Sequence, residues 1–156
     1  MEKRNNLNSS DKELLLKDLS ARLPYGVKCE ITGLGSRTVC GIRKYKDTYD
    51  VHIGYDICGN SLNFDIEKIK PYLRPLSSMT SAEKSELELL GFRYDSDCTD
   101  IINEDVNEYD DYRQHPYTAV DEIRCSEVMD FLRSHHFDHL DLIPKGFALY
   151  KEGMYD

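Results

Sequence analysis

The chain has 156 residues, a formal net charge of −9 and 40% hydrophobic residues, which fits one ordinary domain or two small ones with a core of moderate size. No stretch approaches the roughly 18 apolar residues of a membrane-spanning helix, and the N-terminus is too polar for a secretory signal, so we expect a cytoplasmic protein. The five cysteines include no CxxC pair, which favours reduced thiols over a disulfide framework or a zinc ribbon.

Charge is unevenly distributed along the chain. Residues 1–75 carry 13 basic and 10 acidic side chains, whereas residues 76–156 carry 7 and 19. The acidic half repels phosphate backbones at long range, which argues against duplex nucleic acid as a partner of the whole chain. A small anionic ligand at a basic site in the first half stays compatible with this distribution.

The first predicted element is an amphipathic helix. Ser10 and Glu13 form a capping-box pair at its start, five leucines follow between positions 14 and 23, and Pro24 ends it.

The hydrophobic period then changes from about 3.6 to 2, which predicts half-buried strands. Apolar side chains alternate over 27–31, 49–55 and 62–66. Short turn signals separate these segments and favour antiparallel pairing: GLGS at 33–36, YKD at 45–47 and CGN at 58–60. A helix followed by four or five such strands predicts a small antiparallel β-barrel of the SH3-like or Sm-like type over residues 1–75.

Two prolines mark the end of this barrel. Neither Pro71 nor Pro75 can continue a central strand, so we place a domain boundary near residue 76. Thr80 and Glu83 form a second capping box, and the short helix that they open closes at Gly91.

The region 76–156 is expected to be acidic and mainly helical. Residues 95–122 are densely acidic and weakly periodic, which predicts a long surface segment. A helical stripe returns at 128–135 after the candidate N-cap Ser126, and a short strand or hairpin is expected at 146–150. The whole pattern predicts an α+β fold.

The stretch SHHFDH at 134–139 raises the question of a metal site or a catalytic base. On a continuous helix, His135 and His139 would share a face, and Asp138 would supply a carboxylate. A structural role is favoured, in which His135 completes the apolar stripe, His136 lies at the helix C-terminus, and the chain leaves the helix before His139. The glutamate of the HExxH motif is absent.

Other kinds of site find little support. The acidic stretch 95–111 has Asp100 and Val106 where an EF-hand requires Gly and Glu, so a solvated loop or a protein-facing acidic patch is expected. GLGS at 33–36 lacks the lysine and the following helix of a phosphate loop. Cys29 alternates with apolar neighbours and is expected in the core. We therefore predict no metal ion, no cofactor and no catalytic residue.

A basic patch is the strongest candidate for a binding site. Four cations and two tyrosines gather around one predicted turn: Arg37, Arg43, Lys44, Lys46, Tyr45 and Tyr49. Positive charge beside aromatic rings binds phosphorylated ligands through charge-assisted hydrogen bonds and stacking. The alternative is a hairpin tip whose charges only keep it soluble.

Three blocks of the sequence carry a resemblance: LLLKDLSARLPYGVK at 14–28, IKPYLRPLSSMTSAEK at 69–84, and FLRSHHFDHLDLIPKGFALY at 131–150 followed by EGMYD. Together they resemble the small, mostly uncharacterised proteins of phages, prophages and mobile elements of gut Bacteroidetes. The resemblance implies a mobile-element origin and a site of action inside a bacterial cell. It transfers no catalytic residue, and it weighs against a metal pair because similar proteins commonly hold another residue at the position of His139.

We predict a non-catalytic accessory protein that acts as a binding module, with Arg37, Arg43, Lys44, Tyr45 and Tyr49 as its ligand-binding residues. The resemblance suggests counter-defence by sequestering a host protein or a small signalling nucleotide. Two alternatives stay open: a hydrolase or nucleotide-modifying enzyme that uses the histidine cluster, and an acidic adaptor that docks on a basic protein or mimics nucleic acid. Strand edges of small barrels also favour a homo-oligomer.

Overall fold

The structure, a computed structural model, describes the backbone of residues 7–94, 101–103 and 119–156, and the side chains of residues 7–91 and 126–156. The chain forms two compact units: unit 1 comprises Met1–Leu73 and Leu140–Asp156, and unit 2 comprises Arg74–His139. The boundary expected near residue 76 would place residues 140–156 in the second region. In the structure, the contacts of this C-terminal segment group it with unit 1.

Unit 1 opens with helix α1 (Ser9–Arg22), which a short 3-10 helix, η1 (Leu23–Tyr25), follows. The N-cap is Asn8 and not the expected Ser10, because the Asn8 side-chain oxygen accepts a hydrogen bond from the Asp11 N–H at 2.8 Å. Asparagine and serine are equally good N-caps, so composition alone does not separate the two positions.

Two three-stranded antiparallel sheets follow, in the strand orders β2-β1-β6 and β3-β4-β5. A short 3-10 helix, η2 (Ile66–Lys68), joins the last two strands. The strands are β1 (Lys28–Ile31), β2 (Gly35–Thr38), β3 (Gly41–Tyr45), β4 (Thr48–Tyr55), β5 (Ser61–Asp65) and β6 (Ile69–Pro71). The α+β class is thereby confirmed, whereas the sheets do not form one closed ladder among the described residues.

The chain passes from one sheet to the other at two consecutive residues. The Val39 N–H donates to the Val27 carbonyl at 2.9 Å, whereas the Cys40 N–H donates to the His52 carbonyl at 2.8 Å. β2 and β3 therefore form the two halves of one bent strand. β2 pairs with β1 in the first sheet, and β3 pairs with β4 in the second.

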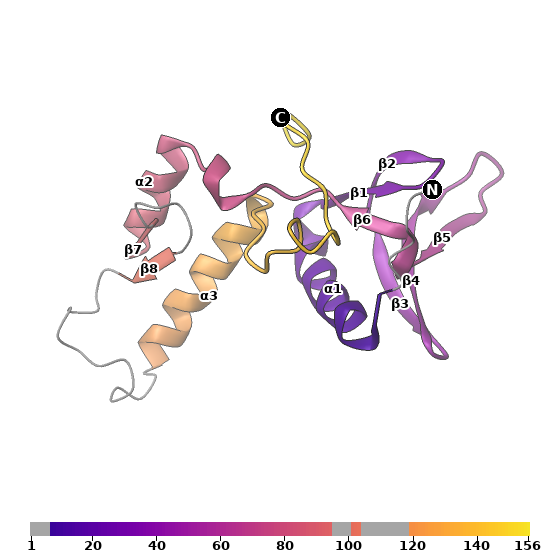
Figure 1. Cartoon of the computed structure of the whole chain (residues 1–156), viewed down its shortest axis with the longest axis horizontal. Coiled ribbons are helices and arrows are strands. Elements are labelled where there is room, and N and C mark those ends of the chain that lie inside the picture. The colour runs from indigo at the N-terminus through magenta and orange to yellow at the C-terminus, as the bar shows by residue number, and fades with distance from the viewer. Residues whose placement is uncertain (1–6, 95–100, 104–118) are drawn as a thin grey trace. The chain divides into compact units, whose positions relative to one another are not determined.

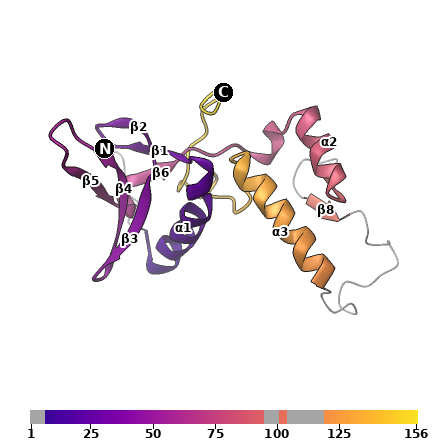
Figure 2. The same cartoon turned by 180° about the vertical axis from the view of Figure 1, so that it is seen from behind.

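Helix α1 lies against the strands of unit 1 (Figures 1 and 2). The core between them is made of aliphatic side chains and Cys29, whose burial raises the pKa of its thiol to about 12. A core position for Cys29 was expected, and it is confirmed. The buried members are Leu15, Leu19, Val27, Cys29, Ile31, Val39, Val51, Ile53, Ile66, Ile69, Leu73, Leu142 and Ala148.

The C-terminal segment returns to unit 1 through specific hydrogen bonds. The Leu149 N–H donates to the Pro71 carbonyl at 2.9 Å, and the strand expected around Leu149 is reduced to a single bridge with Tyr72. The Tyr155 hydroxyl accepts from the Lys28 N–H at 2.9 Å and donates to the Tyr72 carbonyl at 2.7 Å. These bonds fasten the end of the chain to β1 and β6.

Unit 2 contains helices α2 (Ser81–Leu89) and α3 (Ala119–Ser134) and the paired strands β7 (Phe92–Tyr94) and β8 (Ile101–Asn103). The expected capping box at the start of α2 is present, with both of its hydrogen bonds. α3 begins at Ala119, well before the expected N-cap Ser126.

A small apolar cluster forms the core of unit 2: Met79, Leu87, Val128, Phe131, Leu132 and Phe137. The acidic stretch considered for calcium, 95–111, lies outside the described residues except for β8. None of the described helices combines the length and the apolarity needed to cross a membrane.

Candidate functional site

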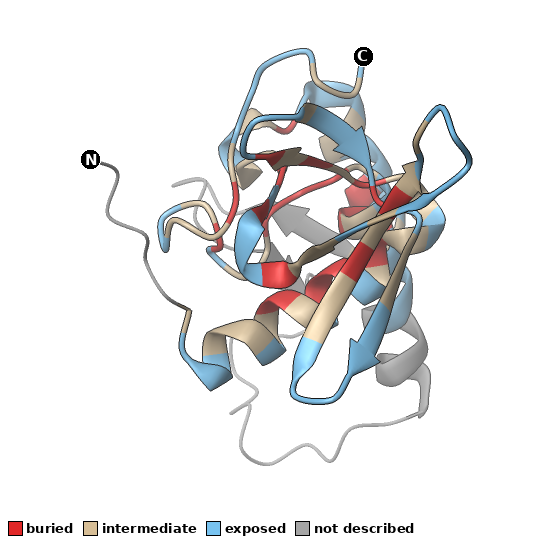
Figure 3. Ribbon diagram, turned by 90° about the vertical axis from the view of Figure 1, so that its right-hand side faces the viewer, coloured by how far each residue is buried: buried red, intermediate tan, exposed pale blue. Residues whose placement is uncertain are grey.

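The tip of the β3–β4 hairpin is a tight, exposed turn. Tyr45 and Thr48 are the last paired residues, so Lys46 and Asp47 form a two-residue turn. Lys46 has a φ of 54°, and the Thr48 hydroxyl donates to the Tyr45 carbonyl at 2.8 Å. Residues 43–48 are all exposed, and Figure 3 shows the end of the hairpin in pale blue.

The register divides the predicted patch between the two faces of the hairpin. β4 buries Val51 in the core, so Tyr49, two residues earlier, and Lys44, which is paired with Tyr49, lie on the inner face. Arg43 and Tyr45 flank Lys44 on β3 and therefore lie on the outer face. The sequence predicted one cluster, and the structure separates it into two smaller groups.

On the outer face, the half-exposed Tyr45 ring carries two cations. The Arg43 guanidinium lies 5.8 Å from the ring centroid and the Lys46 ammonium lies 5.6 Å from it. Arg43 also forms a loose ion pair with Asp50, with an N···O distance of 3.7 Å. A cation over a ring is held in position while its N–H donors stay directed to other partners.

The remaining predicted residues lie elsewhere. On the inner face, the Lys44 ammonium lies 5.8 Å from the centroid of the Tyr49 ring. Arg37 lies on β2 in the other sheet, opposite Cys29, and its guanidinium donates to the Ser36 carbonyl at 2.8 Å. The strand pairing does not bring Arg37 into the hairpin.

Two aromatic residues extend the outer face along β4. His52 lies two residues beyond Asp50, and its ring packs edge-on against Tyr55 with centroids 5.1 Å apart. His52 Nδ1 is 3.0 Å from the Ser61 hydroxyl, and Tyr55 is 69% exposed. The period-2 pattern of β4 could have placed His52 on this face, but Tyr55 joins it only through a register shift that the sequence does not reveal.

The histidine-rich stretch is the end of a helix. His136 has a φ of 63°, and the Phe137 N–H donates to the Leu132 carbonyl at 2.8 Å, which is the arrangement of a Schellman C-cap. The chain therefore leaves the helix before His139, so His135 and His139 do not share a helix face.

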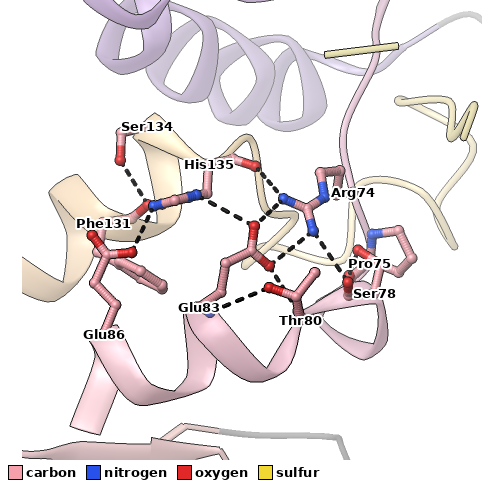
Figure 4. Close-up of polar contacts among 9 residues, drawn as sticks. All are labelled: Arg74, Pro75, Ser78, Thr80, Glu83, Glu86, Phe131, Ser134 and His135. Atoms are coloured by element: carbon pink, nitrogen blue, oxygen red, sulfur yellow. Dashed lines mark hydrogen bonds and ion pairs between the residues drawn. The ribbon is translucent and has the colours of Figure 1, made fainter. Parts of the chain in front are cut away.

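His135 contacts helix α2 (Figure 4). Its Nδ1 lies 3.4 Å from Glu83, its Nε2 lies 3.4 Å from Glu86, and its ring lies 4.6 Å from that of Phe131. Within the described part of the chain, no group of three or more His, Cys, Asp or Glu side chains is placed to hold a metal ion.

Glu83 is fully engaged in this network. Both of its carboxylate oxygens accept from Arg74, at 2.7 and 3.0 Å, and one of them also accepts from the Thr80 N–H at 2.8 Å. Burial would raise the pKa of Glu83, but the hydrogen bonds from Arg74 and Thr80 and the guanidinium charge outweigh it and lower the pKa to about 2. A carboxylate held in this way is a poor proton acceptor near neutral pH, which argues against a role for Glu83 as a catalytic base. The contacts of the network instead connect α2 to the end of α3.

The two groups of charged side chains differ in how many of their hydrogen-bonding groups a ligand could use. Glu83 and Arg74 bond to each other and to neighbouring protein groups, whereas the cations of the hairpin are exposed to solvent. Comparison with protein-family models, curated proteins and solved structures finds no match to this chain.

Proposed function

We propose that the protein is a non-catalytic binding module that holds a small anionic nucleotide on the outer face of the β3–β4 hairpin. The observation that carries this proposal is the pair of cations, Arg43 and Lys46, over the exposed ring of Tyr45. A guanidinium and an ammonium donate to phosphate oxygens, and a tyrosine ring offers a stacking surface to a base. Lys44 and Tyr49 provide a second, smaller group on the inner face.

The cations are available because the protein itself uses them little. The Arg43 side chain is 67% exposed, and its ion pair with Asp50 is long at 3.7 Å. Among the described residues, Lys44 and Lys46 take part in no ion pair. An exposed pair of this kind contributes about 0–1 kcal/mol, so a phosphate group displaces Asp50 at little cost.

A small barrel of the SH3-like or Sm-like type is our inference for unit 1. Two connections between the sheets support it. The chain passes directly from β2 in one sheet to β3 in the other, and the 3-10 helix η2 connects β5 to β6 across the same two sheets, as in a barrel made of one strongly curved sheet. A barrel of this size projects its hairpins from a rigid base, which suits a binding surface on the hairpin.

The biological setting of the proposal comes from the sequence resemblance. We interpret the blocks at 14–28, 69–84 and 131–150 as a resemblance to small, mostly uncharacterised proteins of phages, prophages and mobile elements. In that setting the module would act in the bacterial cytoplasm and counter a host defence by sequestering a signalling nucleotide or a host factor.

Calorimetric titration with a panel of linear and cyclic nucleotides tests the binding site. At least one member should bind, and Arg43→Ala should weaken its binding about tenfold or more, as expected for the loss of a charge-assisted contact. Tyr45→Ala should also weaken binding through lost stacking. Lys70→Ala is the matched control, because Lys70 is an exposed cation on β6 outside the hairpin and its removal should leave the affinity unchanged.

Chromatography of the recovered ligand tests the absence of catalysis. The ligand should be released chemically unchanged. Turnover of a panel member would favour the enzyme alternative and direct attention to His135 and Asp138. No binding, together with a partner protein that is lost on neutralising residues 104–111, would favour the acidic adaptor.

A further inference from the structure

The open strand edges of unit 1 are not protected equally. The edge of β6 is covered at its C-terminal end by the chain itself, because the Leu149 N–H donates to the Pro71 carbonyl and the Leu73 N–H donates to the Leu149 carbonyl. β5 is the last strand of the β3-β4-β5 sheet, and among the described residues its outer edge has no backbone hydrogen-bond partner. A row of free N–H and C=O groups is a template for another strand.

The composition of β5 makes this edge different from the others. β3, at the opposite side of the same sheet, carries Arg43 and Lys44, and β2 carries Arg37. Cations, prolines and bulges on an edge strand discourage pairing with other chains. β5 reads SLNFD: it has no lysine, arginine, proline or glycine, and its charged residue, Asp65, is the last of the strand. The extra residue of the β4–β5 register shift falls on β4.

We propose that β5 pairs antiparallel with β5 of a second copy of the chain, about a two-fold axis at Asn63. In this register Leu62 lies opposite Phe64 of the partner subunit, so side chains that are half-buried against the core meet on one face. The exposed residues Ser61 and Asn63 meet polar residues on the other face. An axis at Asn63 overlaps all five residues of β5 and places polar positions opposite polar ones and apolar opposite apolar, so the edge is self-complementary.

The expected association is weak. An edge of five residues makes an interface below about 1,200 Å², so the dimer should form at high protein concentration and dissociate on dilution. The pairing does not involve the hairpin residues of the proposed nucleotide site. Because β5 and β3 are at opposite sides of the sheet, the dimer leaves both hairpin tips open.

A cross-linking experiment tests the position of the axis. Residues directly opposite each other have Cβ atoms about 4.5–5.5 Å apart, so two Asn63→Cys side chains come within reach of a disulfide after a small adjustment. Under mild oxidation, Asn63→Cys should form a covalent dimer faster than Lys70→Cys, which is exposed on the covered strand β6. Peptide mapping must assign the bond to position 63, because Cys40 and Cys58 are also exposed.

The unmodified protein provides a second measurement. Sedimentation velocity should show a concentration-dependent dimer, and amide hydrogen exchange over residues 61–65 should slow as the concentration rises. Asn63→Lys should restore the monomer, because two ammonium groups would face each other across the axis. A monomer at every concentration, with no faster cross-linking of Asn63→Cys, would overturn the proposal. A dimer that persists in Asn63→Lys would place the interface on another surface, and protection of 61–65 only on adding an extended peptide would make the occupant a different chain.

Discussion

Arg74 in unit 2 and Arg43 in unit 1 have the same side chain and opposite surroundings. Arg74 is 22% exposed, donates to both carboxylate oxygens of Glu83 and to the Ser78 carbonyl, and lies 4.4 Å from the centroid of the Phe137 ring. Arg43 is 67% exposed and has one long ion pair. The donors of Arg74 stabilise the fold, whereas those of Arg43 stay available to a ligand.

A third arginine, Arg22, is even more buried than Arg74. The side chains of Arg22 and Asp18 are both 0% exposed, and Arg22 Nε donates to Asp18 at 2.8 Å within α1. Charge alone therefore does not locate a binding site in this protein. The exposure and the existing partners of each cation decide whether it is structural or free to bind.

Among the substitutions considered, we expect the largest loss of stability for Arg22, the most buried of the three arginines. Arg22→Ala leaves the Asp18 carboxylate buried beside a cavity, so we expect a loss of about 3–5 kcal/mol in the free energy of unfolding. Urea titration followed by circular dichroism measures it. The double variant Asp18→Leu, Arg22→Met should recover much of the loss, because it removes both charges and fills the space. A loss below about 1 kcal/mol for Arg22→Ala would mean that this pair is not structural.

An intermediate effect is expected for Glu83, and pH reveals it. The pKa of Glu83 is lowered to about 2 in the folded protein from an ordinary value of 4.5, so its contribution is complete above about pH 4.5 and is lost as the pH falls towards 2. The shift corresponds to roughly 3 kcal/mol. Urea midpoints measured from pH 6 to pH 2.5 should fall more steeply for the natural protein than for Glu83→Gln. Parallel curves would show that Arg74 does not hold Glu83 in its ionised form.

Local patterns in the sequence predicted the elements that depend on neighbouring residues. The capping box of Thr80 and Glu83, the antiparallel strands and the core position of Cys29 are all present. Each of these follows from residues a few positions apart, because caps and strand alternation are set within one or two turns.

Features that depend on distant residues were not predicted. The C-terminal segment joins unit 1 because Tyr155 bonds to Lys28 and Tyr72, and no local pattern signals that return. The tie between Arg74 and His135 is similar, because the Arg74 guanidinium donates to the His135 carbonyl across 61 positions of sequence.

The candidate site was predicted in composition but not in geometry. The sequence placed cations and tyrosines near one turn, whereas the register separates Arg43 and Tyr45 from Lys44 by face and leaves Arg37 in another sheet. A shift of one residue in pairing exchanges the faces of every side chain, so the division depends on the exact register.

The smallest effect on stability is expected for the Arg43–Asp50 pair of the hairpin. The strength of this pair determines whether Arg43 is available to a ligand. A double-mutant cycle with Arg43→Ala and Asp50→Ala should give a coupling of about 0–1 kcal/mol, because the pair is long and Arg43 is largely exposed. Thermal unfolding of the four proteins measures it, and each melting temperature should stay close to that of the natural protein. Asp50→Ala should also strengthen nucleotide binding, since it removes the carboxylate that, among the described residues, pairs with Arg43 and competes with phosphate for it. A coupling well above 1 kcal/mol would make Arg43 structural, like Arg74, and would leave Lys46 as the remaining cation over Tyr45.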